Sequence, residues 1–433
     1  MNERVSRRDF LGVLGTGSLL PGLAAGQTFN GADVPSASRA LWDWLRAQLV
    51  LEPGLAWLDS AASGPTLRAS LGQGFKARER QSSDFEAYSA LASGPDAIRR
   101  RLTDIASFLG TTADDLAFTC GADEGLSIVA QGLDLQAGDE VVTTAQDRGG
   151  AVYPWLLAAK RRGIKVTQLP HAGVPVSPDV ITGRFVSAIT PKTRVLAFAH
   201  VQASDGTVMP VRELCALARS KGIFSVVDGA LASGMLDLRI ADLGCDAYAT
   251  SFHHWLNAPY GTGALYVERA ARARVWPLVV DSPAGWDVND RSGTPYSASG
   301  LPETQAKYGA LSRYDTPDFQ CVGPAIELQD TVSRARIVAR ILELASYARP
   351  QLAALPAAEV LTPSHPSLAA GIVTVRFAGR DHAALARALA DEDRVAVGCV
   401  AIGPALDAIR VSLHPSNSFD DLDRLAAALR RRL

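Results

Sequence analysis

Short apolar runs alternate with helix-length amphipathic segments through the middle of this chain. Six runs have the length and composition of buried strands, at residues 116–119, 140–144, 165–169, 194–200, 224–228 and 246–250. This alternation predicts an α/β fold with a mostly parallel sheet and helices on both faces. Because ligands of such sheets bind at the carboxyl ends of the strands, the residues that end or follow each run are candidates for a site.

The pattern changes on both sides of this region. An amphipathic helix is expected at residues 37–51, and a long helix at 319–347 after an irregular stretch rich in Pro, Gly, Ser and Asp, 268–306. Three further strands (371–377, 395–400, 409–413) and two helices (381–390, 420–432) are predicted beyond it. We therefore expect an N-terminal arm at 27–56, a large domain at 57–318, and a long helix with a smaller α+β domain at 319–433.

The first residues have the order of an export signal. Ser6-Arg7-Arg8-Asp9-Phe10-Leu11 precedes a weakly apolar, Gly-rich run at 12–20 and the small residues 24–26. An arginine pair before such a run is typical of a twin-arginine signal peptide. We expect residues 1–26 to be removed and the mature protein to be periplasmic or extracellular, with no membrane segment in the mature form.

Composition narrows the class of partner. With 433 residues, 47% of them hydrophobic and 20% charged, the chain suits a soluble protein with two cores. A net charge of −2 gives no sign of a nucleic-acid partner. The five cysteines are widely spaced and include no C-x-x-C, so we expect no metal site.

The stretch 250–267 carries the most specific motif, T-S-F-H-H-W-L-N-A-P-Y-G-T-G-A-L-Y-V. It resembles the cofactor segment of class V aminotransferases, roughly S-x-H-K-W-L-x-x-P-x-G-x-G-x-L. These are pyridoxal-phosphate (PLP) enzymes and include cysteine desulfurases and isopenicillin N epimerase. His254 stands at the position of the lysine that binds PLP covalently. The segment 57–65, W-L-D-S-A-A-S-G-P, resembles the family's N-terminal motif.

The resemblance covers residues 57–417 and implies PLP fold-type I. That fold has a large domain with a mostly parallel seven-stranded sheet and a smaller C-terminal α+β domain. It also implies a homodimer with the site near the subunit boundary. Thr316, which follows Tyr314 and Asp315, would then reach the neighbouring subunit's phosphate.

By the same resemblance, several residues take roles around the cofactor. Asp228 would pair with the pyridine nitrogen, and Arg410 would grip a substrate carboxylate with its planar fork. A helix cap for Asp228 and a surface salt bridge for Arg410 stay open as alternatives. The remaining cofactor-binding candidates are Gly121, Ala122, Asp123, Arg148, His200, Ser251, His253 and Thr316, and Arg148 is also a substrate-binding candidate.

The departures from the family pattern decide how the chemistry is interpreted. Imidazole moves protons near neutral pH but forms no stable imine, so His254 is a candidate base only. Asp123 replaces a threonine of the phosphate cradle, and a carboxylate about 4 Å from a phosphate charge costs about 4 kcal/mol at an effective dielectric near 20. Arg148 replaces a ring-stacking His or aromatic residue, and Leu231 and Ala203 replace partners of the phenolic oxygen. Of the six lysines, Lys307 is the one candidate near the site.

Three hypotheses follow. The first is an altered enzyme that uses PLP or pyridoxamine phosphate (PMP) without a covalent bond. His254 would be its base, and Asp228 would be the partner that keeps the cofactor ring electron-withdrawing. The second is a pseudoenzyme that binds an anionic small molecule, such as a carboxylate, between Arg148 and Arg410. The third is an ordinary PLP-dependent lyase or transaminase whose lysine is lost by mutation. Departures spread over the pocket disfavour the third, and the sequence leaves the substrate and reaction open.

Overall fold

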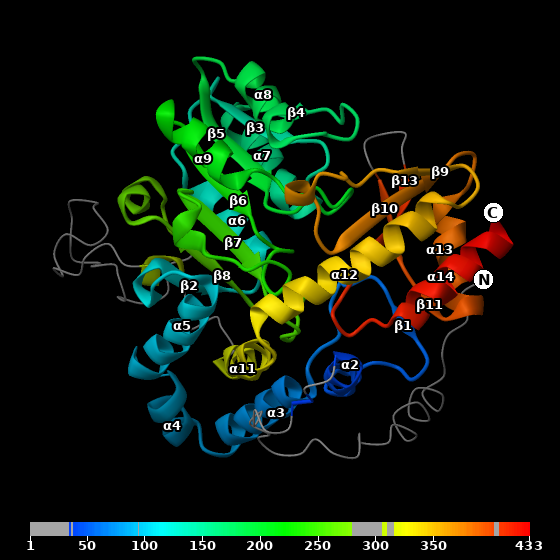
Figure 1. Cartoon of the computed structure of the whole chain (residues 1–433). Coiled ribbons are helices and arrows are strands. Elements are labelled where there is room, and N and C mark those ends of the chain that lie inside the picture. Colours follow the sequence, from blue (N-terminus) through cyan, green and yellow to red (C-terminus); the bar gives the residue numbers. More distant parts are fainter. Residues whose placement is uncertain (1–33, 36–37, 94, 279–304, 310–315, 402–406) are drawn as a thin grey trace, which may run out of the picture.

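A seven-stranded sheet lies at the centre of the larger part of the chain (Figure 1). The computed structural model describes residues 34–35, 38–93, 95–278, 305–309, 316–401 and 407–433. Along the sheet the strands lie in the order β2-β8-β7-β6-β5-β3-β4, and β8 alone runs in the opposite direction to the others. The strands are β2 (Leu116–Thr119), β3 (Glu140–Thr144), β4 (Lys165–Leu169), β5 (Thr193–Ala199), β6 (Phe224–Asp228), β7 (Ala247–Ser251) and β8 (Gly263–Val267). The predicted mostly parallel, seven-stranded sheet is confirmed.

Helices cover both faces of this sheet, and its strands are largely buried apart from the edge strand β4. Val226 and Val227, successive residues of β6, enter two different apolar clusters. The Val226 face is covered by α6 (Ala122–Gly132) and α7 (Gly149–Arg162). The Val227 face is covered by α5 (Pro95–Leu109), α8 (Pro178–Ala188) and α9 (Val211–Ser220).

A second, antiparallel sheet of four strands forms a smaller unit in the order β12-β13-β10-β9. Its strands are β9 (Ala358–Val360), β10 (Ile372–Phe377), β12 (Gly398–Ala401) and β13 (Asp407–Ser412), with helices α13 (His382–Asp393) and α14 (Phe419–Arg432). The short strand β1 (Ala56–Trp57) pairs in parallel with β11 (Val395–Ala396). The segment that follows β1 is thereby held against the smaller unit. Helix α2 (Ser38–Ala47) also joins it, because Arg46 pairs with Asp421 of α14 at 2.6 Å.

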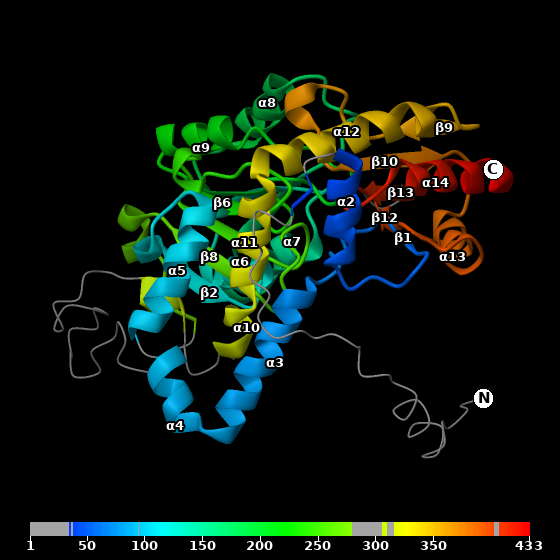
Figure 2. The same cartoon turned by 60° about the horizontal axis from the view of Figure 1, so that its bottom comes forward.

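The predicted continuous helix at 319–347 is wrong. Its residues form parts of three helices, α10 (Thr316–Gln320), α11 (Val322–Val332) and α12 (Arg334–Ala353). Ser333 interrupts the pattern with a φ of 80°, which ends one helix and redirects the chain. Helix α11 packs on α3 (Arg68–Ser83) and α5, whereas α12 packs along the smaller sheet (Figures 1 and 2). The packing requires a change of direction that the sequence signals with neither Gly nor Pro.

The predicted strand at 395–400 is also divided. Val395–Ala396 pairs with β1, and Gly398–Ala401 pairs with β13, so Val397 separates two short strands in different sheets. In the part of the chain that the structure describes, no helix combines the length and apolar character needed to span a bilayer.

Candidate functional site

An arginine held between two carboxylates lies at the carboxyl end of the large sheet. Asp228, the last residue of β6, accepts hydrogen bonds from Arg148 Nε at 2.6 Å and Nη2 at 3.1 Å. Arg148 Nη1 donates to Asp123 of α6. The Asp228 side chain is only 3% exposed, and its Oδ1 also accepts the Ala230 N–H at 2.9 Å. Burial lowers the pKa of Arg148, but Asp228 and Asp123 more than offset it and raise that pKa above its usual value.

The local backbone allows this close approach. Arg148 directly precedes α7, and Gly150 lies beside the contact between Arg148 and Asp123. A Cβ at position 150 would lie 2.2 Å from Asp123 Oδ1 and 2.5 Å from Arg148 Nη1. The glycine therefore leaves the space in which Arg148 and Asp123 form their ion pair. Together with Asp228, the group has two negative charges and one positive charge.

Two backbone donors at the start of α6 are engaged within the chain. The Ala122 N–H donates to Ser251 Oγ at 2.9 Å, and the Cys120 N–H donates to the Glu124 carboxylate at 2.7 Å. Gly121 separates them with a φ of 143°. A helix N-terminus attracts anions through backbone N–H groups that have no partner within the helix and through the helix dipole. Here Glu124 and the neighbouring Asp123 place two carboxylates where an incoming anion would bind.

His254 is buried in the site and is held as a neutral imidazole. Its Nδ1 is 3.1 Å from the Ser60 carbonyl oxygen, which accepts a hydrogen bond, so Nδ1 carries the proton and Nε2 is left as an acceptor. Burial and then His253 lower the pKa of His254 well below 6.5, and the charges of Arg148 and Arg410 lower it further. His254 is therefore uncharged at neutral pH.

The His253 ring packs at a tilt against two neighbouring rings. Its ring centroid lies 4.1 Å from that of His254 and 4.2 Å from that of Tyr260, which is 75% exposed. Burial and then the charge of Arg148 lower the pKa of His253 to about 4. Its Nδ1 is buried and, among the described residues, has no hydrogen-bond partner.

The segment after β1 passes directly over these histidines. The Gly64 N–H donates to the His253 carbonyl at 2.7 Å. A Cβ on Gly64 would lie 1.7 Å from the His254 carbonyl oxygen, so the two backbones touch. The 57–65 motif and the 250–267 motif, distant in sequence, form one site.

Arg410, on β13 of the smaller sheet, contributes the second arginine of the site. Its Nη2 donates to Asp59 at 2.8 Å and its Nη1 to the Ala203 carbonyl at 2.9 Å. The pKa of Asp59 is raised because burial outweighs the opposing charge of Arg410. Three buried polar atoms nearby have no partner among the described residues, namely Arg410 Nε, Ser60 Oγ and Ser412 Oγ. Sequence reasoning left Asp59 without a role, because nothing local indicates a partner 351 residues away.

The structure leaves other candidates outside this group. His200 donates its backbone N–H to the Asp228 carbonyl, but its side chain bonds the Tyr248 hydroxyl at 2.9 Å on the opposite face of the sheet. Lys307 does not reach the site, because its Nζ donates to the Arg272 carbonyl at 2.5 Å, and Arg272 pairs with Asp115 at the amino end of β2. Thr316 is the first residue of α10. Tyr314 and Asp315 lie outside the described residues.

Comparisons with known proteins agree with the fold and the motif. The aminotransferase class-V family matches residues 56–425. Isopenicillin N epimerase of Streptomyces clavuligerus is 30% identical over 401 residues, which cover 90% of this chain and 97% of the epimerase. A cysteine desulfurase of Serratia proteamaculans is 28% identical, covering 87% and 93%. This chain belongs to the class V aminotransferase family.

Solved structures show the same fold. The cysteine desulfurase CsdA from Escherichia coli matches with a TM-score of 0.74 at 23% identity, covering 94% of this chain and 98% of CsdA. A mutant of C-DES with glycine covalently linked to its PLP cofactor matches with a TM-score of 0.75 at 22% identity, covering 89% and 98%. The predicted family and PLP fold-type I are confirmed, and kinship with PLP enzymes supports PLP as the cofactor of this fold.

The residues of this chain nevertheless do not fit PLP as arranged. The carboxylate that would pair with the pyridine nitrogen, Asp228, is already engaged by Arg148 through both oxygens. The phosphate position is bordered by Asp123 and Glu124, and the donors of Ala122 and Cys120 are taken.

Proposed function

We propose that this protein is an exported binding protein on the class V aminotransferase fold, a pseudoenzyme toward lysine-bound PLP. Its ligand would be a small carboxylate or amino-acid-like molecule. The observation that carries the proposal is the bidentate contact of Arg148 with Asp228. Arg148 binds the carboxylate with which the pyridine nitrogen of PLP would have to pair.

The second arginine supports the ligand class. Arg410 is 7% exposed, and its Nε has no acceptor among the described residues. The unpaired hydroxyl of Ser412 lies two residues along the same strand, on the same face. Buried donors left without partners are costly. A carboxylate that accepts from them would remove that cost.

A second candidate function is proton transfer on the bound ligand by His254. The fixed Nδ1 contact with Ser60 favours it, because the tautomer leaves Nε2 as the acceptor. His254 could also act as a base on PLP or PMP bound without a covalent bond. The carboxylates of Asp123 and Glu124 at the phosphate position disfavour this alternative. The proton-transfer candidate predicts exchange of the α-hydrogen of a bound amino acid in D₂O, and loss of that exchange in His254→Gln.

A ligand titration tests the main proposal. The full chain would be titrated with alanine, pyruvate and alaninamide, and the thermal midpoint Tm and the heat of binding measured. The carboxylates should bind and alaninamide should not. The double variant Asp59→Asn with Arg410→Gln removes both charges of the pair. It should bind the carboxylates about 10- to 150-fold more weakly, because one charge-assisted hydrogen bond from Arg410 to the ligand is lost.

A matched control removes an exposed pair from the same sheet. Arg376 and Glu359 are 3.3 Å apart at the surface, so Arg376→Gln with Glu359→Gln should leave ligand binding unchanged. Equal binding of alanine and alaninamide, or equal loss in both double variants, contradicts the proposed site. A stable visible absorbance band after PLP is added to the unmodified chain contradicts the pseudoenzyme proposal.

We extend the proposal to assembly and location. The family resemblance supports a homodimer with a site near the subunit boundary, which sedimentation at micromolar concentration would detect. The arginine pair at residues 7 and 8 supports twin-arginine export to the periplasm or beyond.

A further inference from the structure

A hollow of about 430 Å³ lies among α3, α4 (Phe85–Tyr88) and α5, and it shares no lining residue with the site around Arg148. Figure 2 shows these three helices extending together from the body of the molecule. The volume is within the range of small-molecule sites, about 300–1,000 Å³. The lining includes Lys76 and Arg80 of α3, Arg101 of α5, and the apolar surfaces of Tyr88 and Leu91.

Two of the cations lie close together on α3. Lys76 and Arg80 are four residues apart on α3, so they share a helix face, and like charges at that spacing destabilise a helix. Within the described residues neither forms an ion pair, whereas Arg78 on the same helix pairs with Asp318 at 2.8 Å. An anion between Lys76 and Arg80 would relieve their repulsion.

The third cation has an unused donor. Arg101 Nη2 donates to the Ala92 carbonyl, but Arg101 Nε is buried and has no partner among the described residues. Guanidinium groups bind phosphate through paired N–H donors. An acceptor in the hollow would satisfy the donor that the protein leaves unpaired.

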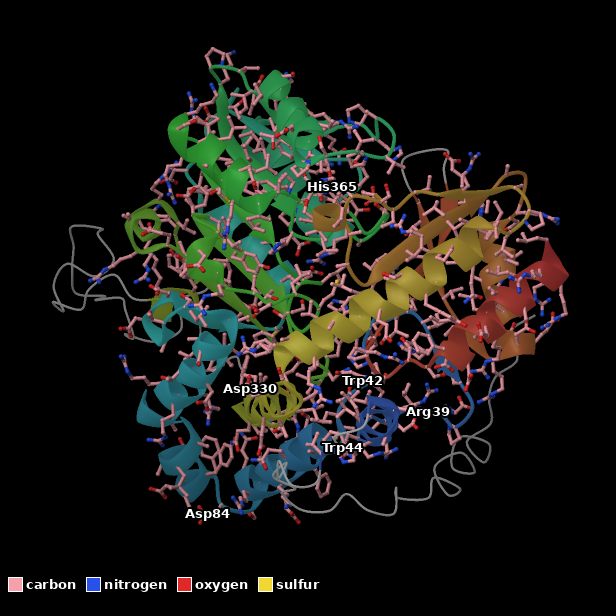
Figure 3. All side chains as sticks on the ribbon, in the orientation of Figure 1. Arg39, Trp42, Trp44, Asp84, Asp330 and His365 are labelled. Atoms are coloured by element: carbon pink, nitrogen blue, oxygen red, sulfur yellow. The ribbon has the colours of Figure 1, made fainter. Side chains whose placement is uncertain are left out.

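The hollow keeps a surplus of positive charge. Among its described lining residues the one acid is Asp84, at the turn between α3 and α4 (Figure 3). Asp84 Oδ1 accepts the Ala87 N–H at 2.9 Å and so caps α4. Three cations against one carboxylate leave two positive charges, which matches a phosphate monoester at neutral pH. Leu91, 77% exposed, and the Tyr88 ring offer apolar contact for its organic part.

We propose that this hollow binds a phosphate monoester, with the phosphate held by Lys76, Arg80 and Arg101 and the organic group against Tyr88 and Leu91. The site is independent of the carboxylate site between Arg148 and Arg410.

Calorimetric titration of the full chain with phenyl phosphate tests the proposal, with benzoate and benzyl alcohol as comparison ligands. Phenyl phosphate should bind more tightly than benzoate, and benzyl alcohol should not bind. The double variant Lys76→Gln with Arg80→Gln changes one half-buried and one exposed side chain and should weaken binding at least about tenfold, since charge-assisted contacts are lost. The matched control Arg78→Gln, on the same helix, should leave the affinity unchanged.

Hydrogen exchange locates the bound ligand. Phenyl phosphate should slow exchange in peptides from residues 68–101. The proposal is overturned by absence of binding, by equal affinity of the double variant, or by protection confined to the start of α6 at residues 122–132. The last outcome would place the phosphate at the family's cofactor position instead.

Discussion

The contact between Arg148 and Asp228 predicts that restoring the missing lysine will not restore PLP binding. For the pyridine nitrogen to reach Asp228, Arg148 must give up hydrogen bonds of 2.6 and 3.1 Å to a carboxylate that is 3% exposed. Each charge-assisted bond contributes about 1.5–3 kcal/mol, so displacing both costs about 3–6 kcal/mol. His254→Lys alone should therefore bind PLP about 10²- to 10⁴-fold more weakly than His254→Lys with Arg148→His.

Asp123 should contribute less than Arg148. About 4 kcal/mol of repulsion is expected for a carboxylate 4 Å from a phosphate charge at an effective dielectric near 20. The Asp123 side chain is 68% exposed, however, and solvent reduces this to about 1 kcal/mol. His254→Lys with Asp123→Thr should thus improve on His254→Lys by about fivefold, and the triple variant should bind PLP most tightly.

The assay is an absorbance titration of the four variants with PLP, after circular dichroism has shown that each is folded. Borohydride reduction and mass mapping should then find pyridoxyl-lysine at position 254 in the triple variant. Binding by His254→Lys within tenfold of the triple variant would refute the reasoning, because the Arg148–Asp228 contact would then pose no obstacle to the cofactor.

Three further expectations concern export, pH and packing. Arg7→Lys with Arg8→Lys should leave the precursor in the cytoplasm, and normal appearance of mature protein in the periplasm would contradict the export signal. Burial raises the pKa of Asp147 to about 6, so the folded form binds a proton more readily than the unfolded form. Stability should fall by about 3 kcal/mol as pH rises from about 4 to 6 and then level off, and the difference in Tm between the unmodified chain and Asp147→Asn should follow that course; a difference independent of pH would count against the shift. Gly64→Ala should lower Tm and abolish carboxylate binding because its Cβ would lie 1.7 Å from the His254 carbonyl oxygen, and an unchanged Tm would contradict the close packing.

Local sequence patterns predicted the scaffold well for a physical reason. Most strands of the large sheet are buried on both faces, so they appear as short runs rich in apolar and β-branched residues. The edge strand β4 is the exception, since none of its residues is fully buried. Runs such as 116–119 and 224–228 coincide with strands β2 and β6 to the residue. The break at Ser333 escaped prediction because it depends on where α11 and α12 pack, not on a local helix-breaking residue.

The site was only partly predictable. Its positions followed from strand ends and from the family motif, which identified Asp228, Arg148 and Arg410. The partners did not follow, because Arg148 meets Asp228 across 80 residues and Arg410 meets Asp59 across 351. Sequence reasoning made Arg148 a candidate for binding cofactor or substrate, and a single sequence does not show that its charge is instead paired within the protein.

The same pair, Arg410 with Asp59, determines when this pocket can first exist. Its two halves are made near the beginning and near the end of synthesis, 351 residues apart. At typical elongation rates of about 5–20 residues per second, roughly 20–70 s separate the two halves. Until Arg410 is synthesised, Asp59 cannot form this ion pair. The contact then has to close a long loop, which costs entropy and slows folding. The sheet around β6 can form early, whereas the binding pocket is a late product of folding, so truncated chains should keep secondary structure and lack the pocket.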